Sequence, residues 1–138
     1  MTLVRTAIAT VNALVGTERH ADAIRVGEEG RRIAENVVGS DHPLTAFATS
    51  AVGRAQLAAG LPEAAINLEA ALRILEGHTT PPDELSNAQF ELAQALWIDR
   101  HQRDRARALA ESAGRLVEGM EGEASLHDDI AAWLEAHR

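Results

Sequence analysis

The sequence predicts an all-α array of helical hairpins, and three observations support this fold class. One spaced pattern of residues occurs three times, at intervals of 41 and 42 residues. Alanine, a small residue and the strongest helix former, is abundant, whereas aromatic residues make up only 3% of the chain. No segment shows the alternation of apolar and polar residues that is typical of a half-buried strand. A repeat of this length indicates units that bury their apolar faces against one another.

The repeated pattern combines small, charged and aliphatic residues. Its three copies are Ala23, Glu28, Gly30, Arg32, Ile33 and Glu35, then Ala64, Glu69, Ala71, Arg73, Ile74 and Glu76, then Ala106, Glu111, Ala113, Arg115, Leu116 and Glu118. The alanine and glycine positions predict close helix crossings, because small side chains let two helices approach each other. The first glutamate of each copy precedes the arginine by four residues, which predicts ion pairs within one helix; a repeated binding ladder is the alternative.

Seven helices are predicted from the apolar periodicity and from glycine, proline and capping residues. Their ranges are 3–15, 21–38, 43–59, 62–76, 83–100, 103–120 and 125–137. Short connections predict antiparallel neighbours, so the first six helices form hairpins over about 3–38, 43–77 and 83–120. The seventh carries one apolar face, and we expect it to cap the last hairpin, with Ser125 as its capping residue and Asp83 capping the fifth helix. The chain 1–138 is expected to form a single domain.

Charge and composition argue against several kinds of function. The net charge of −8 argues against nucleic-acid binding, which needs a basic surface. The absence of cysteine excludes disulfides and thiolate chemistry. The first residues lack the pattern of a signal peptide, and no stretch approaches the roughly 20 apolar residues that span a bilayer. We therefore expect a cytoplasmic protein that does not enter a membrane, and a start directly on a helix also fits a piece of a longer protein.

Three segments of the second hairpin resemble the tetratricopeptide repeat: Val52-Gly53, the stretch from Gly60 to Ala64, and Ala71-Leu72. The segment 39–46 is similar to the linker of the longer-period, kinesin-light-chain type of this repeat. The resemblance covers nearly the whole chain. It implies a right-handed superhelix of three helical hairpins plus a capping helix, which binds a peptide or protein segment in a concave groove and has no catalytic activity.

The resemblance also implies which residues contact the partner, because the first helix of each hairpin lines the family's groove. The outward positions on those helices are Thr6, Thr10, Asn12, Ser50, Arg54, Leu57, Asn87, Gln94 and Trp97. Polar side chains around an apolar anchor suit the capture of a peptide. Trp97 is either this anchor or a core residue, since a large aromatic side chain on a helix serves both purposes.

The part of the chain after Asp83 is similar to the C-terminal repeat region of large bacterial serine/threonine protein kinases. The resemblance rests on 83–85, on Phe90, on 92–97 and on 103–110. It implies a scaffold or regulatory part of a bacterial signalling protein. The chain itself has no glycine-rich loop, no lysine and no kinase catalytic motif, so it does not act as a kinase by that mechanism.

We expect no cofactor, and the sequence has no nucleotide-binding glycine motif. Two rival functions remain open. One is self-association into homo-oligomers. The other is a metal-dependent enzyme that uses His127 and Asp128, although adjacent helical residues point in different directions and an acidic first helical turn explains them as well. Asp41 and His42 form either an acid–base pair or a capping turn at a helix start.

One basic cluster stands out in an otherwise acidic chain. It consists of Arg100, His101, Arg103, Arg105 and Arg107, with Asp99 and Asp104 interleaved. Arginine pairs well with carboxylates and phosphates, so the cluster is either a docking site for an acidic or phosphorylated segment or a solvated turn.

Overall fold

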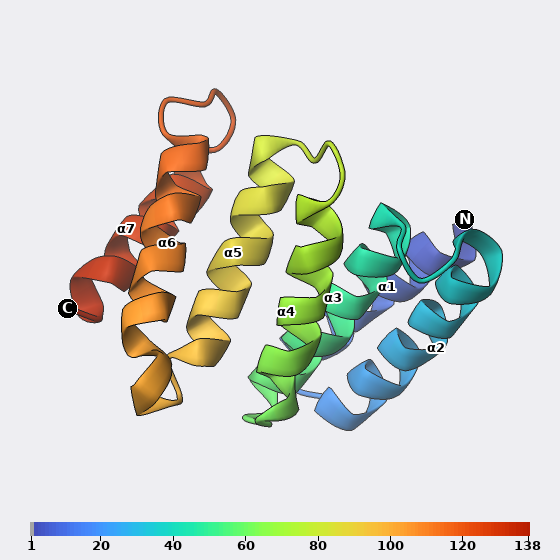
Figure 1. Cartoon of the computed structure of the whole chain (residues 1–138). Coiled ribbons are helices and arrows are strands. Elements are labelled where there is room, and N and C mark those ends of the chain that lie inside the picture. The colour runs from blue at the N-terminus through green and yellow to red at the C-terminus, as the bar shows by residue number, and fades with distance from the viewer. Residues whose placement is uncertain (1) are drawn as a thin grey trace. The chain divides into compact units, whose positions relative to one another are not determined.

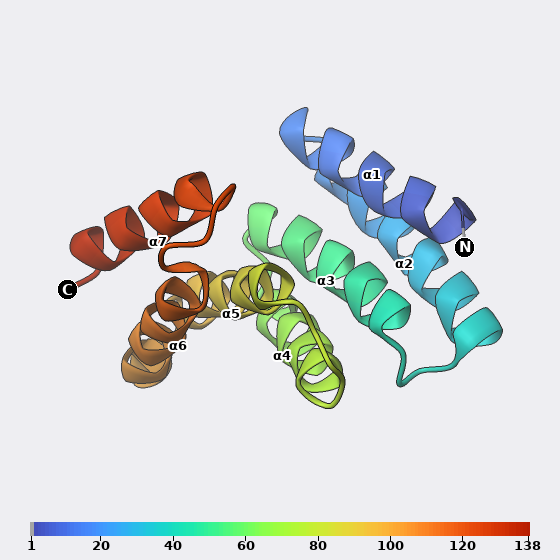
Figure 2. The same cartoon turned by 90° about the horizontal axis from the view of Figure 1, so that it is seen from above.

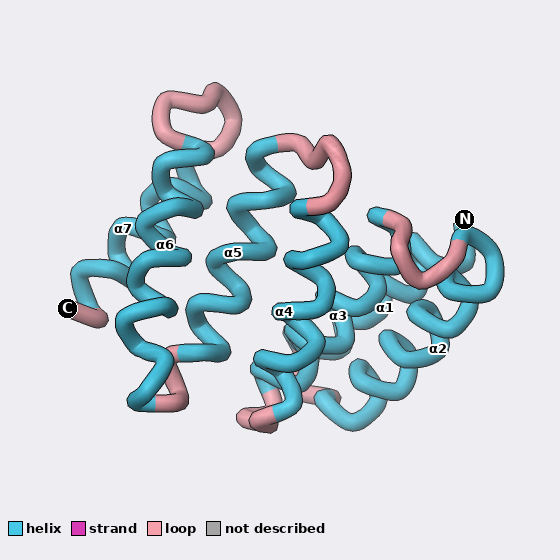
Figure 3. The backbone as a smooth tube through the Cα atoms, viewed as in Figure 1, coloured by secondary structure: helices cyan, strands magenta, loops and turns pink. Residues whose placement is uncertain are grey.

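A computed structural model describes residues 2–138, and it consists of helices joined by short loops (Figures 1 and 3). The elements are α1 (Thr2–Gly16), α2 (His20–Val38), α3 (Pro43–Ala58), α4 (Glu63–Glu76), α5 (Pro82–Leu96), the 3-10 turn η1 (Arg100–Gln102), α6 (Arg103–Val117) and α7 (Ala124–Ala136). The described residues contain no strand, which confirms the predicted all-α fold class. The chain divides into two compact units, residues 1–78 and 79–138, and the single-domain organisation stays a prediction.

In the first unit, α3 packs against both α1 and α2, and it also forms a hairpin with α4 (Figure 2). Two core clusters hold α1, α2 and α3 together. They consist of Val4, Ala34, Leu44 and Ala48, and of Val11, Ala23, Ala51 and Ala55. Most of these side chains are small, so the helices approach closely and the core stays dense without aromatic residues.

Two glycines mark close helix approaches in this unit. A Cβ atom added to Gly30 on α2 would lie 2.9 Å from the Cβ of Ala7 on α1. A Cβ atom added to Gly53 on α3 would lie 2.7 Å from the Cγ of Leu68 on α4. Both positions therefore need a residue without a side chain, and Gly30 is one of the predicted close crossings.

A chain of polar side chains links α2, α4 and α3. Arg31 donates from Nη1 to the Oδ1 of Asn67 at 3.1 Å, and Asn67 donates from Nδ2 to the Oε1 of Gln56 at 2.7 Å. Arg31 also pairs with Glu28 one turn earlier on α2. The predicted partner of Glu28 was Arg32, but Arg32 is exposed on the outer side of α2, whereas Arg31 lies next to α4.

In the second unit, α5 and α6 form an antiparallel hairpin, and α7 packs against α6. Leu92 on α5, Val117 on α6 and Ile130 on α7 are fully buried. Ser86 on α5 is also buried, and its hydroxyl group donates to the carbonyl oxygen of Ala113 on α6 at 2.8 Å. Ile130 is the one fully buried side chain that α7 contributes among the described residues.

Several helix ends differ from the prediction, each for a local reason. The helix α5 ends at Leu96 rather than near residue 100, because Asp99 caps η1 by accepting a hydrogen bond from the backbone N–H of His101 at 2.9 Å. The helix α6 ends at Val117, after which Glu118 is extended and Gly119 adopts a positive φ of 72°. Ser125 lies inside α7 and Asp83 inside α5, so neither residue is the cap that the sequence predicted.

Equivalent positions of the repeated pattern have equivalent surroundings. Ala23, Ala64 and Ala106 are buried, with at most 1% of each residue exposed. The aliphatic positions are half-buried and the arginine positions are exposed in all three copies. The repeated sequence thus produces a repeated local environment, as expected for hairpins that share one packing scheme.

Candidate interaction surfaces

Two of the predicted partner-binding residues meet on the surface of the first unit. Arg54 on α3 donates from Nη1 to the Oδ1 of Asn12 on α1 at 2.6 Å, across 42 residues of sequence. Thr6 is exposed, and Thr10 and Leu57 are partly exposed. We call the surface formed by these five residues the α1–α3 face, since both helices contribute to it and pack against each other.

Ser50 does not belong to this face, although the sequence predicted an outward position for it. Only 5% of Ser50 is exposed. The reason is that α3 packs against three helices, α1, α2 and α4, which leaves it little free surface. Along this part of α3, Arg54 and Leu57 remain accessible.

The second unit carries the other three predicted residues, on α5 and directly after it. Asn87 is exposed and donates from Nδ2 to the carbonyl oxygen of Asp83 at 3.1 Å. Gln94 is partly exposed. Trp97 is half-buried in a cluster of rings, where it supports α7, and its role in partner binding stays untested.

The ring cluster joins the end of α5 to α7. Trp97 meets Trp133 edge to face, with ring centroids 5.5 Å apart, and meets His137 in the same way at 4.9 Å. His137 stacks on Trp133 at 4.1 Å, and Phe90 meets Trp133 edge to face at 6.0 Å. These geometries are favourable for aromatic pairs and hold the C-terminal end of α7 in place.

Two arginines of α6 cover the ring of Trp97. The Cζ of Arg103 lies 4.7 Å from the ring centroid, and its Nε donates to the carbonyl oxygen of Trp97 at 3.1 Å. The Cζ of Arg107 lies 5.6 Å from the same ring, and its Nε and Nη2 each donate to the carbonyl oxygen of His137 at 3.3 Å. Cation–π stacking and hydrogen bonds together fix both guanidinium groups. In the sequence, Arg103 and Arg107 are four residues apart, and this spacing indicates that both side chains lie on the same side of α6.

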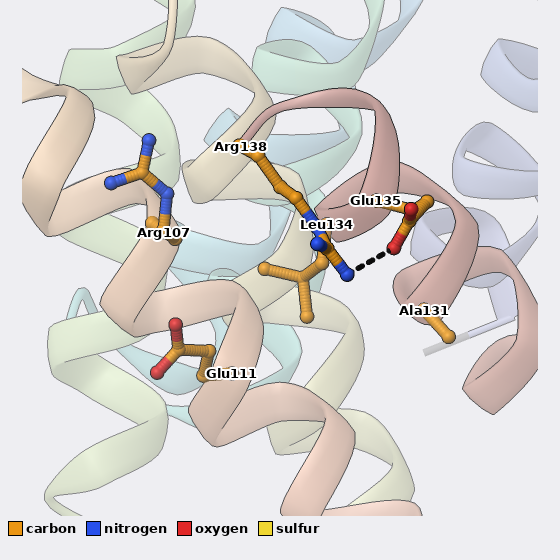
Figure 4. Close-up of a pocket in the computed structure, with 6 residues that line it drawn as sticks. All are labelled: Arg107, Glu111, Ala131, Leu134, Glu135 and Arg138. Atoms are coloured by element: carbon orange, nitrogen blue, oxygen red, sulfur yellow. Dashed lines mark hydrogen bonds and ion pairs between the residues drawn. The ribbon is translucent and has the colours of Figure 1, made fainter.

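A shallow hollow of about 310 Å³ lies between α6 and α7 (Figure 4). Its lining residues are Arg107, Glu111, Ala131, Leu134, Glu135 and Arg138. Arg138 pairs with Glu135 at 2.5 Å across one turn. The charges that line the hollow are balanced, so it has no strong preference for an anion or a cation.

The remaining candidate residues have structural roles or stand apart. His42 caps α3, because its Nδ1 accepts a hydrogen bond from the backbone N–H of Leu44 at 3.0 Å; this supports the capping interpretation of Asp41 and His42. The Nδ1 of His127 lies 3.8 Å from the Oδ1 of Asp128. Within residues 2–138, no three His, Asp or Glu side chains are grouped to hold a metal ion.

The carboxyl group of Asp22 has a clearly shifted pKa. The guanidinium of Arg19 donates a hydrogen bond to Asp22 at 2.6 Å and attracts its negative charge, which lowers the pKa of Asp22 below its usual value. Arg25 adds a weaker contribution from a distance of 3.5 Å. Asp22 stands in the first turn of α2, where its negative charge also suits the helix dipole.

Comparison with known proteins agrees with this architecture. Residues 6–77 match the family model of the tetratricopeptide repeat, and the chain therefore belongs to the tetratricopeptide repeat family. This confirms the family resemblance drawn from the sequence. Repeats of this family mediate protein–protein interaction and are typically not catalytic. The resemblance to bacterial kinase regions stays a prediction.

Solved structures support the same fold. Crystal structures of nearly identical TPR-like repeats, assigned to a kinesin light chain of Podosopora anserina, are similar to the chain with TM-scores of 0.83 for a point variant and 0.84 for the unmutated repeats. Sequence identity is 20%, and the match covers 97% of this chain and 64% of each crystallised chain. The comparison with curated proteins found no relative. None of the helices in residues 2–138 is long and apolar enough to cross a membrane.

Proposed function

We propose that the chain is an interaction module that captures a peptide or protein segment on the α1–α3 face. The observation that carries the proposal is the hydrogen bond between Arg54 and Asn12. It joins two helices at the surface and fixes a charged group there. A residue held in this way loses less side-chain entropy when a partner binds, which favours affinity.

The chemistry of the α1–α3 face suits a segment with both polar and apolar groups. Leu57 follows Arg54 by three residues, so both side chains share one side of α3. Thr6 and Thr10 add hydroxyl groups on α1, and the hydroxyl of Thr10 donates to the carbonyl oxygen of Thr6 at 2.8 Å. A guanidinium beside an apolar side chain and several hydroxyl groups resembles the mixed centre of many protein interfaces.

The wider setting belongs to the same proposal. The residues after Asp83 support a scaffold or regulatory role in a bacterial signalling protein, and we expect it to act in the cytoplasm. The chain spans about 64% of the length of the solved structures it resembles. The role and the partner of the whole protein are therefore proposals as well.

A selection from a displayed library of random peptides on the wild-type chain tests the α1–α3 face. Selected peptides should bind the Arg54→Glu variant at least about tenfold more weakly, because a charge-assisted hydrogen bond is lost and a repulsion is added. The control is Arg32→Glu on the exposed side of α2, which changes the net charge equally. Equal affinity for both variants would place the binding surface elsewhere.

Light scattering over a concentration series separates this function from self-association. A module that binds other proteins stays at one molar mass as the concentration rises. A molar mass that rises with concentration in the wild type, and returns to that of the monomer in the Arg54→Glu variant, would make a second copy of the chain the occupant of the face.

A further inference from the structure

Arginine side chains gather at one end of the second unit, where the α5–α6 turn lies near the end of α7. We call this region the basic end; its residues are Arg100, Arg103, Arg105, Arg107 and Arg138. The hydrogen bonds from Arg107 to the carbonyl oxygen of His137 show that the end of α7 lies against the start of α6. The whole chain has a net charge of −8, so the basic end has the opposite sign to the protein as a whole.

Helix stability does not account for the basic end. The residue before the repeated alanine is Asp22 at the start of α2 and Glu63 at the start of α4, but Arg105 at the start of α6. An acidic residue there suits the positive end of the helix dipole, and an arginine opposes it. At this one position the third hairpin carries a positive charge in place of a negative one, although Asp104 keeps an acidic residue in the first turn of α6.

Two arginines of the basic end have donors available for a partner. Arg103 uses its Nε for the carbonyl oxygen of Trp97, and none of the described residues accepts a hydrogen bond from its two Nη atoms. Arg100 on η1 is exposed and has no partner within residues 2–138. Ile98 follows Trp97 and precedes both arginines in the sequence, and 61% of Ile98 is exposed. The held guanidinium group of Arg103, the exposed one of Arg100 and the exposed side chain of Ile98, all close in sequence, form a surface that is ready to bind.

We propose that the basic end binds an acidic segment of a partner protein, with carboxylates on Arg100 and Arg103 and an aliphatic side chain on Ile98. Arginine presents paired N–H groups that match the two oxygens of a carboxylate. Asp99 and Asp104 interrupt the positive charge, so the surface does not suit the dense phosphates of a nucleic acid. A short acidic segment places a few carboxylates on the arginines and avoids contact with the acidic remainder of this chain, which would repel it.

This site goes beyond the α1–α3 face and lies in the other unit of the chain. The two proposals therefore succeed or fail separately. A variant of Arg54 leaves the basic end intact, and a variant of Arg100 leaves the α1–α3 face intact.

Isothermal titration calorimetry with a synthetic peptide tests the proposal on the full chain. The probe repeats the sequence Asp-Glu-Leu, and the matched peptide carries Asn and Gln in place of Asp and Glu. The acidic peptide should bind the wild type, and its dissociation constant should rise at least about tenfold in Arg100→Glu with Arg103→Glu. The double variant Arg5→Glu with Arg32→Glu has the same net charge, and its dissociation constant should match the wild type when titrations are done at physiological salt.

A second variant is needed in case the double variant does not fold, because Arg103 packs on Trp97. If circular dichroism shows loss of helix in the double variant, Arg100→Glu alone is compared with Arg5→Glu alone. Absence of heat with the wild type, or equal weakening in the basic-end and control variants, would overturn the proposal. Tighter binding of a phosphoserine peptide or of single-stranded DNA through the same arginines would also overturn it, in favour of a phosphate ligand.

Discussion

The backbone of Gly53 lies directly against the side chain of Leu68, and a methyl group at position 53 would come within 2.7 Å of the Cγ of Leu68 and 2.8 Å of its Cδ2. Leu68 is fully buried, so it has no space into which it can retreat. The contact shows how closely α3 and α4 pack in the first unit.

Replacing Gly53 by alanine should therefore destabilise the protein. Overpacking of a core costs about 1–3 kcal/mol, which exceeds the gain of about 0.5–1 kcal/mol that alanine brings to a helix. Thermal unfolding followed by circular dichroism measures the change. Gly16→Ala is the control in the same unit, because nothing lies within 4 Å of an added Cβ there. A higher melting temperature for Gly53→Ala would show that the two helices have room to separate.

Replacing Asn67 by alanine should break the polar link between α2, α4 and α3. The buried Oε1 of Gln56 then loses its donor and Arg31 loses an acceptor, which costs about 1–3 kcal/mol. Urea unfolding gives the free energy of unfolding of the variant. The exposed Asn36 on α2 provides the control substitution to alanine. If both variants unfold at the same urea concentration, the link contributes nothing to stability.

The cap formed by α7 depends on Ile130, of which 1% is exposed. Ile130→Ala should lower the free energy of unfolding of the second unit by about 2–5 kcal/mol, because it removes buried surface and leaves a cavity. Ile98→Ala, in the same unit, removes the same atoms from an exposed position and should have little effect. Hydrogen exchange of α7 amides checks the result, and unchanged protection in Ile130→Ala would contradict it.

The pKa of Asp22 should be lower than that of an ordinary aspartate and should rise toward the ordinary value in Arg19→Ala. A carboxyl group whose pKa is lowered by folding stabilises the protein above its unfolded pKa. This stabilisation disappears as the pH falls through the folded pKa. Titration of the carboxyl carbon by NMR measures both values. High salt should weaken the shift, since the pair is exposed, and a salt-independent shift would point to another cause.

The repeat and its helices could be predicted because their signals are local. The copies of the pattern, the glycines after helices and the apolar spacing all lie within short windows of sequence. Local signals do not decide whether Arg31 or Arg32 pairs with Glu28. Both stand at a suitable distance from Glu28 along the helix, and Asn67 on another helix decides which of them faces inward.

The candidate surfaces were predictable only in part. A helical period says which residues share a side, but it does not say how many neighbours cover that side. Ser50 is buried because α3 has three neighbours, a number that the sequence of α3 alone does not contain. The surroundings of Trp97 depend on His137, which is 40 positions away in the chain and adjacent in space.

The ring cluster has a practical consequence for spectroscopy. The chain has two tryptophans and no tyrosine, and both tryptophans lie in the second unit. Intrinsic emission therefore reports only on residues 79–138, while circular dichroism averages over all seven helices of the described chain. Coinciding transitions from the two signals mean that both halves melt together, and separate midpoints mean that each half melts by itself.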